Sequence, residues 1–187
     1  MKARAILPGN PGHHAVQFYS DDERLCQAVA DFLADGFAAG QPTLVIATAD
    51  HRKRIRAELV ARHFGVTSLV KTGSVMILDA HEMLEQFMVN GRPHAARFRA
   101  ALGAVLERVS MFGGESIVRG YGEMVDVLCR AGKYDAAIQV EVLWNELAKA
   151  HSFSLLCGYS VGNVASDKVY ADVCAHHTHV HGALAVV

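Results

Sequence analysis

The apolar positions of this chain follow two alternating patterns, short continuous runs and longer stretches with helical spacing. The continuous runs predict strands that are buried on both faces, as in a parallel sheet. These runs cover residues 15–19, 43–48, 74–79, 117–118 and 153–159. Stretches in which apolar residues recur every three or four positions predict helices between the strands. The first of them runs from about Ser20 to Gly36, and the others cover about residues 51–63, 80–89, 94–111, 123–130, 134–151 and 167–176.

Strands that alternate with helices predict a three-layer α/β/α fold, in which helices cover both faces of a mostly parallel central sheet. With 187 residues, the chain has the length of one domain. We expect this domain over residues 13–181. The prolines and glycines at positions 8, 9, 11 and 12 predict a flexible leader over residues 1–12, and residues 182–187 would form a C-terminal tail.

The charge balance limits the classes of partner. Lysines and arginines number 18 against 19 aspartates and glutamates, so no basic field is available to hold nucleic acid or an anionic membrane. No apolar run reaches the roughly 18–20 residues of a membrane span, and the N-terminus lacks the apolar stretch of a secretory signal. We therefore expect a cytoplasmic protein. The four cysteines are far apart, at positions 26, 129, 157 and 174, which is typical of reduced and buried thiols.

The polar residues near the ends of the predicted strands are the candidate binding residues. Because the carboxyl ends of parallel strands meet at one edge of a sheet, these residues would form a rim that binds a small molecule. The predicted ligand-binding residues are His14, Tyr19, Asp21, Thr48, His51, Asp79, Arg119, Tyr121, Glu123 and Tyr159. For the aspartates at positions 21, 50 and 79, taken singly, we favour a different role, in which each caps the helix that follows it.

Residues 118–128 are the most informative segment of this set, because Arg-Gly-Tyr-Gly-Glu joins an apolar run to a helical pattern. The two glycines would allow a sharp turn and leave room for a ligand. Arg119 would then clamp an anion or carboxylate, Tyr121 would stack on the ligand, and Glu123 would accept a hydrogen bond. The structural alternative is a buried ion-pair network of Arg119, Glu123 and Glu141.

Nucleotide hydrolysis and nucleophilic catalysis both lack their motifs. The first predicted strand is followed by Tyr-Ser-Asp-Asp-Glu-Arg, whereas a phosphate loop needs glycines and a Lys-Ser or Lys-Thr pair. The acidic residues at positions 21–23 would repel a triphosphate. Cys157 and His14 are a candidate Cys–His pair, but Cys157 follows two leucines and suits a buried structural thiol. We expect no enzymatic activity, with a degenerate nucleotide-binding module as an alternative.

Histidines near the C-terminus raise the question of a metal. The candidate ligands for zinc, nickel or haem iron are His176, His177, His179, His181 and Cys174. We favour a solvated tail over a metal site, because the cluster is terminal and lacks a paired carboxylate. The identity of any cofactor is left open.

Several segments, taken in order, resemble the MEDS family, the sensory domain of the dichloromethane-responsive repressor of methylotrophs and of related regulators of methanogens. The matching segments begin at His14 (HAVQFYSD), Phe32 (FLADGFAAGQ), Leu44 (LVIATADHR), Arg119 (RGYGEMVDVL), Glu141 (EVLWNEL), Phe153 (FSLLCGY) and Val173 (VCAHHTHV). The resemblance covers about residues 13–181. It implies a sheet related to that of the RecA and KaiC-type circadian-clock ATPases, with the phosphate loop lost.

The resemblance also implies a signal-sensing role, because similar domains are joined to DNA-binding domains, histidine kinases or anti-sigma kinases. The 187 residues themselves contain no output domain. We therefore expect a stand-alone cytoplasmic domain in signal transduction or transcription regulation. It would bind a small ligand at the carboxyl edge of the sheet and act through a regulatory protein partner, such as a kinase, an anti-sigma protein or a DNA-binding protein. A metal- or haem-binding sensor is the alternative function, and a homodimer is one of the oligomeric states left open.

Overall fold

The computed structural model describes residues 12–113 and 117–182. The expected leader, apart from Gly12, and the expected tail, apart from Gly182, lie outside the described residues. The elements are β1 (His14–Tyr19), α1 (Asp22–Ala38), β2 (Thr43–Ala47), α2 (Ala49–Ala61), α3 (Val66–Thr72), β3 (Val75–Asp79), α4 (Ala80–Phe87), β4 (Met88–Val89), β5 (Arg92–Pro93), α5 (Ala95–Ser110), β6 (Val118–Gly122), α6 (Met124–Arg130), α7 (Tyr134–Leu147), β7 (Phe153–Ser160), the 3-10 turn η1 (Val161–Asn163), α8 (Asp167–Ala175) and β8 (His179–His181).

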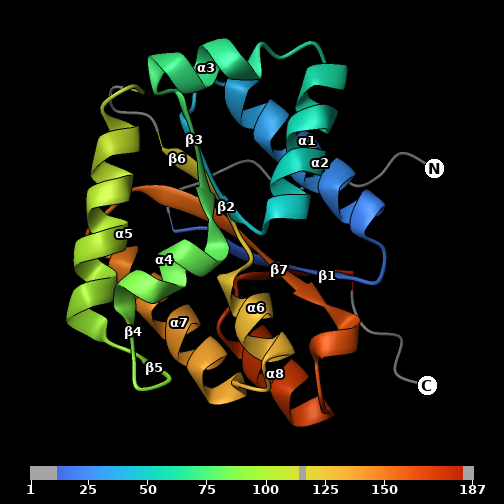
Figure 1. Ribbon diagram of the computed structural model, residues 1–187, viewed down its shortest axis with the longest axis vertical. Helices are drawn as coiled ribbons and strands as arrows, with labels where there is room; N and C mark the ends of the chain where they lie inside the picture. Colours follow the sequence, from blue (N-terminus) through green and yellow to red (C-terminus); the bar gives the residue numbers. More distant parts are fainter. Residues whose placement is uncertain (1–11, 114–116, 183–187) are drawn as a thin grey trace.

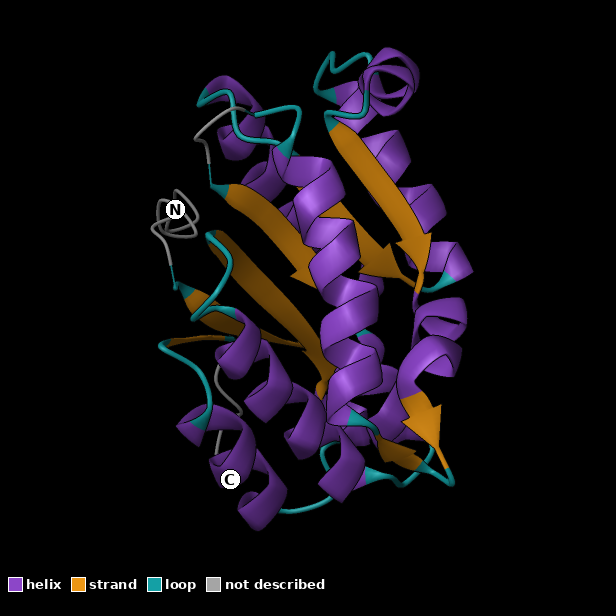
Figure 2. Cartoon of the chain, turned by 90° about the vertical axis from the view of Figure 1, so that its left-hand side faces the viewer, coloured by secondary structure: helices purple, strands orange, loops and turns teal. Residues whose placement is uncertain are grey.

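Six strands form a central sheet in the order β3-β2-β6-β7-β1-β8, and every pairing within it is parallel. A separate two-stranded hairpin joins β4 to β5. Helices cover both faces of the central sheet (Figures 1 and 2). The three-layer α/β/α prediction is therefore confirmed. Across the described residues, no helix combines the length and the apolar character that a bilayer crossing needs.

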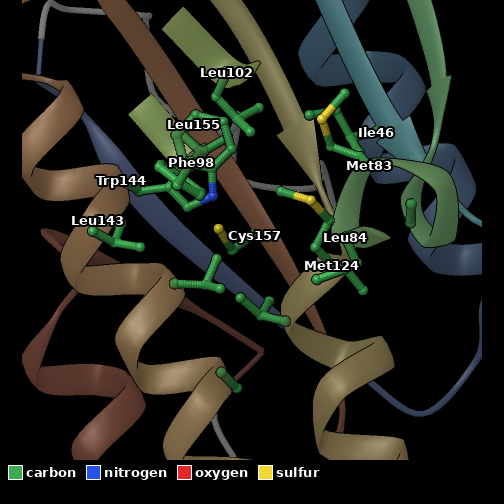
Figure 3. Packing of buried hydrophobic residues seen from close by; sticks show 14 of the residues in the cluster. Ile46, Met83, Leu84, Phe98, Leu102, Met124, Leu143, Trp144, Leu155 and Cys157 are labelled. Atoms are coloured by element: carbon green, nitrogen blue, oxygen red, sulfur yellow. The ribbon is translucent and has the colours of Figure 1, made fainter. Parts of the chain in front are cut away.

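Two apolar cores lie on the two faces of the sheet. Helices α1, α2 and α3 bury their apolar residues against one face, where Tyr121 and Leu156 belong to the same cluster. Helices α4 to α8 pack on the other face, and their cluster includes Cys157 and Tyr159 of β7. Figure 3 shows Trp144 of α7 in this second cluster, with Phe98 of α5 beside it. Side chains that alternate along one strand thus enter different cores.

The glycines of β6 have a role different from the predicted one. The strand was expected to stop at Val118, but it runs on through Gly122. Glycine favours close packing there, because a β-carbon on Gly120 would lie 3.3 Å from Cδ1 of Leu155 on the neighbouring strand. Gly158 on β7 makes room for a side chain of β6, since a β-carbon at position 158 would lie 2.6 Å from the Tyr121 hydroxyl. Gly120 and Gly158 therefore make room for large side chains on the neighbouring strand and do not form a turn.

Other elements differ from the predictions mainly at their ends. Helix α7 ends at Leu147 rather than near residue 151. The short helix α3 and the edge strand β8 were not predicted. Strand β8 pairs with residues 15–17 of β1, so residues 179–181 are part of the sheet. Short elements of this kind give a weak periodic signal, because they span only one or two repeats of the pattern.

Candidate functional site

The carboxyl edge of the sheet carries a buried carboxylate, Glu123, at the position predicted to be functional. Glu123 follows β6 and stands immediately before α6, and it is only 2% exposed. Strand β2 lies next to β6, which places Thr48 and His51 beside Glu123. The sheet topology therefore brings together four of the predicted residues, including Tyr121, which precedes Glu123 by two positions.

The Glu123 carboxylate contacts each of these three neighbours. Its Oε1 accepts a hydrogen bond from the backbone N–H of Thr48 at 2.6 Å. Its Oε2 accepts from the Tyr121 hydroxyl at 2.8 Å and lies 2.6 Å from Nδ1 of His51. On its other side, Nε2 of His51 lies 3.5 Å from the Asp22 carboxylate at the start of α1. We call Glu123, His51, Tyr121 and Thr48 the Glu123 network.

The ionisation of this network follows from its burial and its close partners. Burial opposes the charge on Glu123, but the hydrogen bonds and charge of His51 and the amide of Thr48 outweigh it and lower the Glu123 pKa. The hydrogen bond to Glu123 raises the pKa of His51, against the effect of burial. Burial and the nearby Glu123 charge raise the pKa of Tyr121 well above its usual value. The His51 imidazole and the Glu123 carboxylate therefore each favour the charged form of the other.

A second buried carboxylate at the same edge, Asp126 on α6, was not predicted. Its Oδ1 accepts hydrogen bonds from the Ser160 amide and from Asn163, each at 2.9 Å, and its Oδ2 accepts one from the Tyr19 hydroxyl at 3.2 Å. Arg130, one turn further along α6, lies 3.6 Å from it. A signal was present in the sequence, because this aspartate interrupts the apolar face of a short helix.

Arg119 does not lie at this edge, and the prediction that it shares a corner with Tyr121 and Glu123 is wrong. Because the strand continues through the glycines, Arg119 sits four residues, about 13 Å, before Glu123. Its guanidinium is buried beneath α1, where it donates to the Phe32 carbonyl at 2.9 Å and to Gln41 at 2.8 Å. The alternative of an ion-pair network with Glu123 and Glu141 is also wrong, since Arg119 bonds neither of them.

The aspartates mostly act as helix caps, as favoured. Asp21 caps α1 by accepting from the amides of Glu23 and Arg24, and Asp79 caps α4 in the same way. Asp50 does not cap α2, because that helix begins at Ala49. The Asp21 cap also has a chemical consequence. Its carboxylate occupies the free amides of α1, which is where a phosphate loop would bind a phosphate group.

A cavity of about 500 Å³ opens between α4 and α6, below the carboxyl ends of β3 and β6. Its lining residues are His81, Leu84, Glu85, Met88, Gly91, Val127, Leu128, Arg130, Ala131 and Lys133. None of the ten predicted ligand-binding residues is among them. The volume is within the range of small-molecule sites. Sequence reasoning missed this cavity, because its lining comes from α4, α6, the β4–β5 hairpin and the loop after α6 rather than from the ends of the central strands.

A third polar cluster lies around Glu141 of α7, on the face of the sheet that helices α4 to α8 cover. This carboxylate is fully buried and meets His14 at 3.1 Å, His177 at 3.4 Å and the hydroxyl of Tyr159 at 2.7 Å. Cys157 lies 3.6 Å from the same carboxylate. Burial opposes the ionisation of Glu141, yet the adjacent His177 and His14 hold its pKa well below the usual range. Burial raises the pKa of the Cys157 thiol.

One of the candidate metal ligands near the C-terminus belongs to this cluster. It is His177, whose side chain is fully buried, and the other four candidates lie outside the cluster. His179 and His181 lie on β8, where His179 contacts His13. The favoured interpretation of a solvated histidine tail is therefore wrong for these residues, because the segment folds back onto β1.

The fold and this edge define a class of protein, an α/β domain with an all-parallel sheet, no phosphate loop, and buried polar networks at its strand ends. A model of the family described as the MEthanogen/methylotroph, DcmR Sensory domain (MEDS) matches residues 13–178. The chain belongs to this family, and the predicted resemblance is confirmed. Its family role is the sensing of signals. A comparison with curated proteins returned no match.

Proposed function

We propose that this chain senses a small amphipathic anion in the cavity between α4 and α6 and passes the signal to a protein partner through α6. The family supports the sensory role, and the cavity supplies room for a ligand. One observation carries the proposal. Arg130 lines the cavity, and its guanidinium also lies 3.6 Å from Asp126 at the carboxyl edge.

The lining of the cavity indicates the chemistry of the ligand. Leu84, Met88 and Leu128 offer apolar surface, which suits a hydrocarbon body. Arg130 and Lys133 contribute two cations against the single carboxylate of Glu85, which favours an anionic head group. A medium-chain carboxylate has both parts.

The contacts of Asp126 support a path for the signal. An anionic ligand that draws Arg130 towards the cavity weakens its pairing with Asp126. Asp126 in turn accepts hydrogen bonds from the Ser160 amide and from Asn163 of η1. It also accepts one from the hydroxyl of Tyr19, which lies just before α1. Ligand binding therefore changes the surface formed by η1 and the start of α1. We infer that this surface meets the regulatory partner, a kinase, an anti-sigma protein or a DNA-binding protein.

We also propose that the chain does not hydrolyse nucleotides. The Asp21 carboxylate already caps the α1 amides, and Asp22 adds a second negative charge at that point. Both oppose a bound triphosphate. The relation to the RecA and KaiC-type ATPases stays a prediction.

A thermal-shift experiment tests the proposal, using medium-chain carboxylates and the matching alcohols as probes. Ala131 is exposed at the rim of the cavity and follows α6, and Ala131→Trp would fill the opening. Ala39→Trp is the matched control, because Ala39 is also exposed and follows α1 with nearly the same backbone angles. A site filled at about 100 times Kd stabilises the fold by about 2.7 kcal/mol.

We expect a carboxylate probe to raise the Tm of the wild-type protein and of Ala39→Trp but not of Ala131→Trp, and the alcohols to act more weakly. ATP with magnesium should leave all three Tm values unchanged. Equal shifts in both variants would place the binding site elsewhere. A shift with ATP alone would favour the nucleotide-binding alternative.

A further inference from the structure

Four potential metal ligands converge on the face of the sheet that α7 covers, away from the α4–α6 cavity. His14 comes from β1, Cys157 from β7 and Glu141 from α7, while His177 follows α8. One ligand atom from each lies within 4.8 Å of all the others. Within residues 12–113 and 117–182, no other group of three or more such residues was found. Figure 3 shows Cys157 inside the apolar cluster that lies beneath α7.

The three separations among His14, Glu141 and Cys157 are close to the edges of a tetrahedral site. Bond lengths to zinc of about 2.0–2.3 Å place neighbouring nitrogen, oxygen and sulfur ligands about 3.3–3.6 Å apart. Nε2 of His14 lies 3.1 Å from Oε2 of Glu141 and 3.3 Å from Sγ of Cys157. That sulfur lies 3.6 Å from the same Oε2, and Nε2 of His177 lies 3.4 Å from Oε1.

The surrounding hydrogen bonds leave the correct nitrogen of each histidine for a metal. Nδ1 of His14 lies 3.0 Å from Oδ1 of Asn145, whose amide nitrogen donates to the His176 carbonyl at 3.0 Å. Nδ1 of His177 donates to the Val173 carbonyl at 2.7 Å. In both rings Nδ1 therefore carries a hydrogen, and in the neutral form of each ring the lone pair of Nε2 faces the cluster.

The burial of these groups also calls for a cation. Glu141 is fully buried, and Nε2 of His177, equally buried, makes no hydrogen bond and has Oε1 of Glu141 3.4 Å away. A divalent ion bound by the Cys157 thiolate, the Glu141 carboxylate and two neutral imidazoles has a net charge of zero. A neutral centre is what an apolar interior tolerates best.

We propose that His14, Glu141, Cys157 and His177 form a four-coordinate site for a divalent transition-metal ion of the zinc class. One thiolate, one carboxylate and two imidazoles are the ligand types that zinc accepts. With all four positions supplied by the protein, the site is closed and holds the C-terminal segment to the sheet through His177. The proposal is independent of the ligand cavity and does not depend on it.

Cobalt(II) is the probe for this site, because tetrahedral cobalt absorbs in the visible and a bound thiolate adds a charge-transfer band in the near ultraviolet. The reduced, metal-free full-length chain is titrated with cobalt(II), and the cobalt is then displaced with zinc. The test variants are Cys157→Ser and His177→Gln. Their matched controls are Cys174→Ser and His176→Gln, which change a thiol and an imidazole outside the cluster.

We expect one cobalt per chain and both spectral features in the wild-type protein and in the two controls. Cys157→Ser should lose the charge-transfer band, and His177→Gln should weaken binding at least about tenfold, since even outer partners of a metal contribute about 10–100-fold. Circular dichroism checks that each variant is folded. His177→Gln is the decisive variant if Cys157→Ser fails to fold. A wild-type protein without the tetrahedral spectrum, or a thiolate band that disappears in Cys174→Ser instead, would overturn the proposal.

Discussion

The contact between Gly158 and Tyr121 gives the sharpest stability prediction. A β-carbon at position 158 would lie 2.6 Å from the Tyr121 hydroxyl oxygen and 3.3 Å from two ring carbons. Tyr121 is fully buried, so its ring can yield only by moving into other core atoms. Such a movement also breaks its 2.8 Å hydrogen bond to Glu123. Gly158→Ala therefore strains the core and loosens the Glu123 network together.

The size of the effect follows from these two losses. Overpacking a core costs about 1–3 kcal/mol, and a lost hydrogen bond to a charged group costs about 1.5–3 kcal/mol. Replacing glycine in the unfolded chain returns about 0.4–1 kcal/mol. We expect a net loss of about 2–4 kcal/mol in the free energy of unfolding. For a domain of this size, that loss lowers the Tm by about 4–16 °C.

Urea denaturation followed by circular dichroism measures this loss. Gly162→Ala is the control, because the nearest atom to its new β-carbon, Oγ of Ser160, lies 3.8 Å away. The double variant with Tyr121→Phe removes the atom that clashes most, so Gly158→Ala should cost clearly less in that background. Equal urea midpoints for Gly158→Ala and Gly162→Ala would refute the reasoning. An unchanged cost in the Tyr121→Phe background would show that the clash lies elsewhere.

Three further predictions follow from the polar residues. The pKa of His51 is raised by its hydrogen bond to Glu123, so its charge stabilises the fold below the unfolded pKa of about 6.5, and this contribution is lost as pH rises through the folded value. His51→Gln should therefore lower the urea midpoint more at about pH 6 than at about pH 9, and a pH-independent difference would contradict the pairing. Asp126→Ala should lower the free energy of unfolding by about 2–4 kcal/mol in the same assay, because four partners lose their acceptor. Asp172→Ala, which breaks an exposed ion pair between residues that are also four positions apart, should have no measurable effect. Arg119→Ala should cost about 3 kcal/mol through its lost contacts beneath α1 and yet leave the Tm response to carboxylate probes intact; loss of that response would restore Arg119 as a ligand residue.

The sheet and most of its helices could be predicted, because they span several repeats of the apolar pattern. The polar character of the carboxyl edge could also be predicted, because the carboxyl ends of parallel strands meet at one edge of the sheet. Thr48, His51 and Glu123 meet there because β2 and β6 are neighbours. Their strand order is a tertiary property that no local pattern contains.

The errors have a common physical cause, which is packing between segments far apart in the chain. The glycines of β6 were interpreted as a turn, whereas Gly120 serves the packing of Leu155. Arg119 was expected at the wrong end of its strand as a result. His177 looked like part of a solvated tail, yet β8 pairs with β1 and brings it against Glu141, which lies 36 residues earlier.

The central claim is that a ligand between α4 and α6 acts on η1 through Arg130 and Asp126. Hydrogen exchange measured with the most stabilising carboxylate probe tests it directly. The account predicts slower exchange in α4 and α6 together with faster exchange of the Ser160 amide and of η1, because Asp126 loosens its hold on both. Slower exchange in α4 and α6 with no change at residues 160–163 would contradict it.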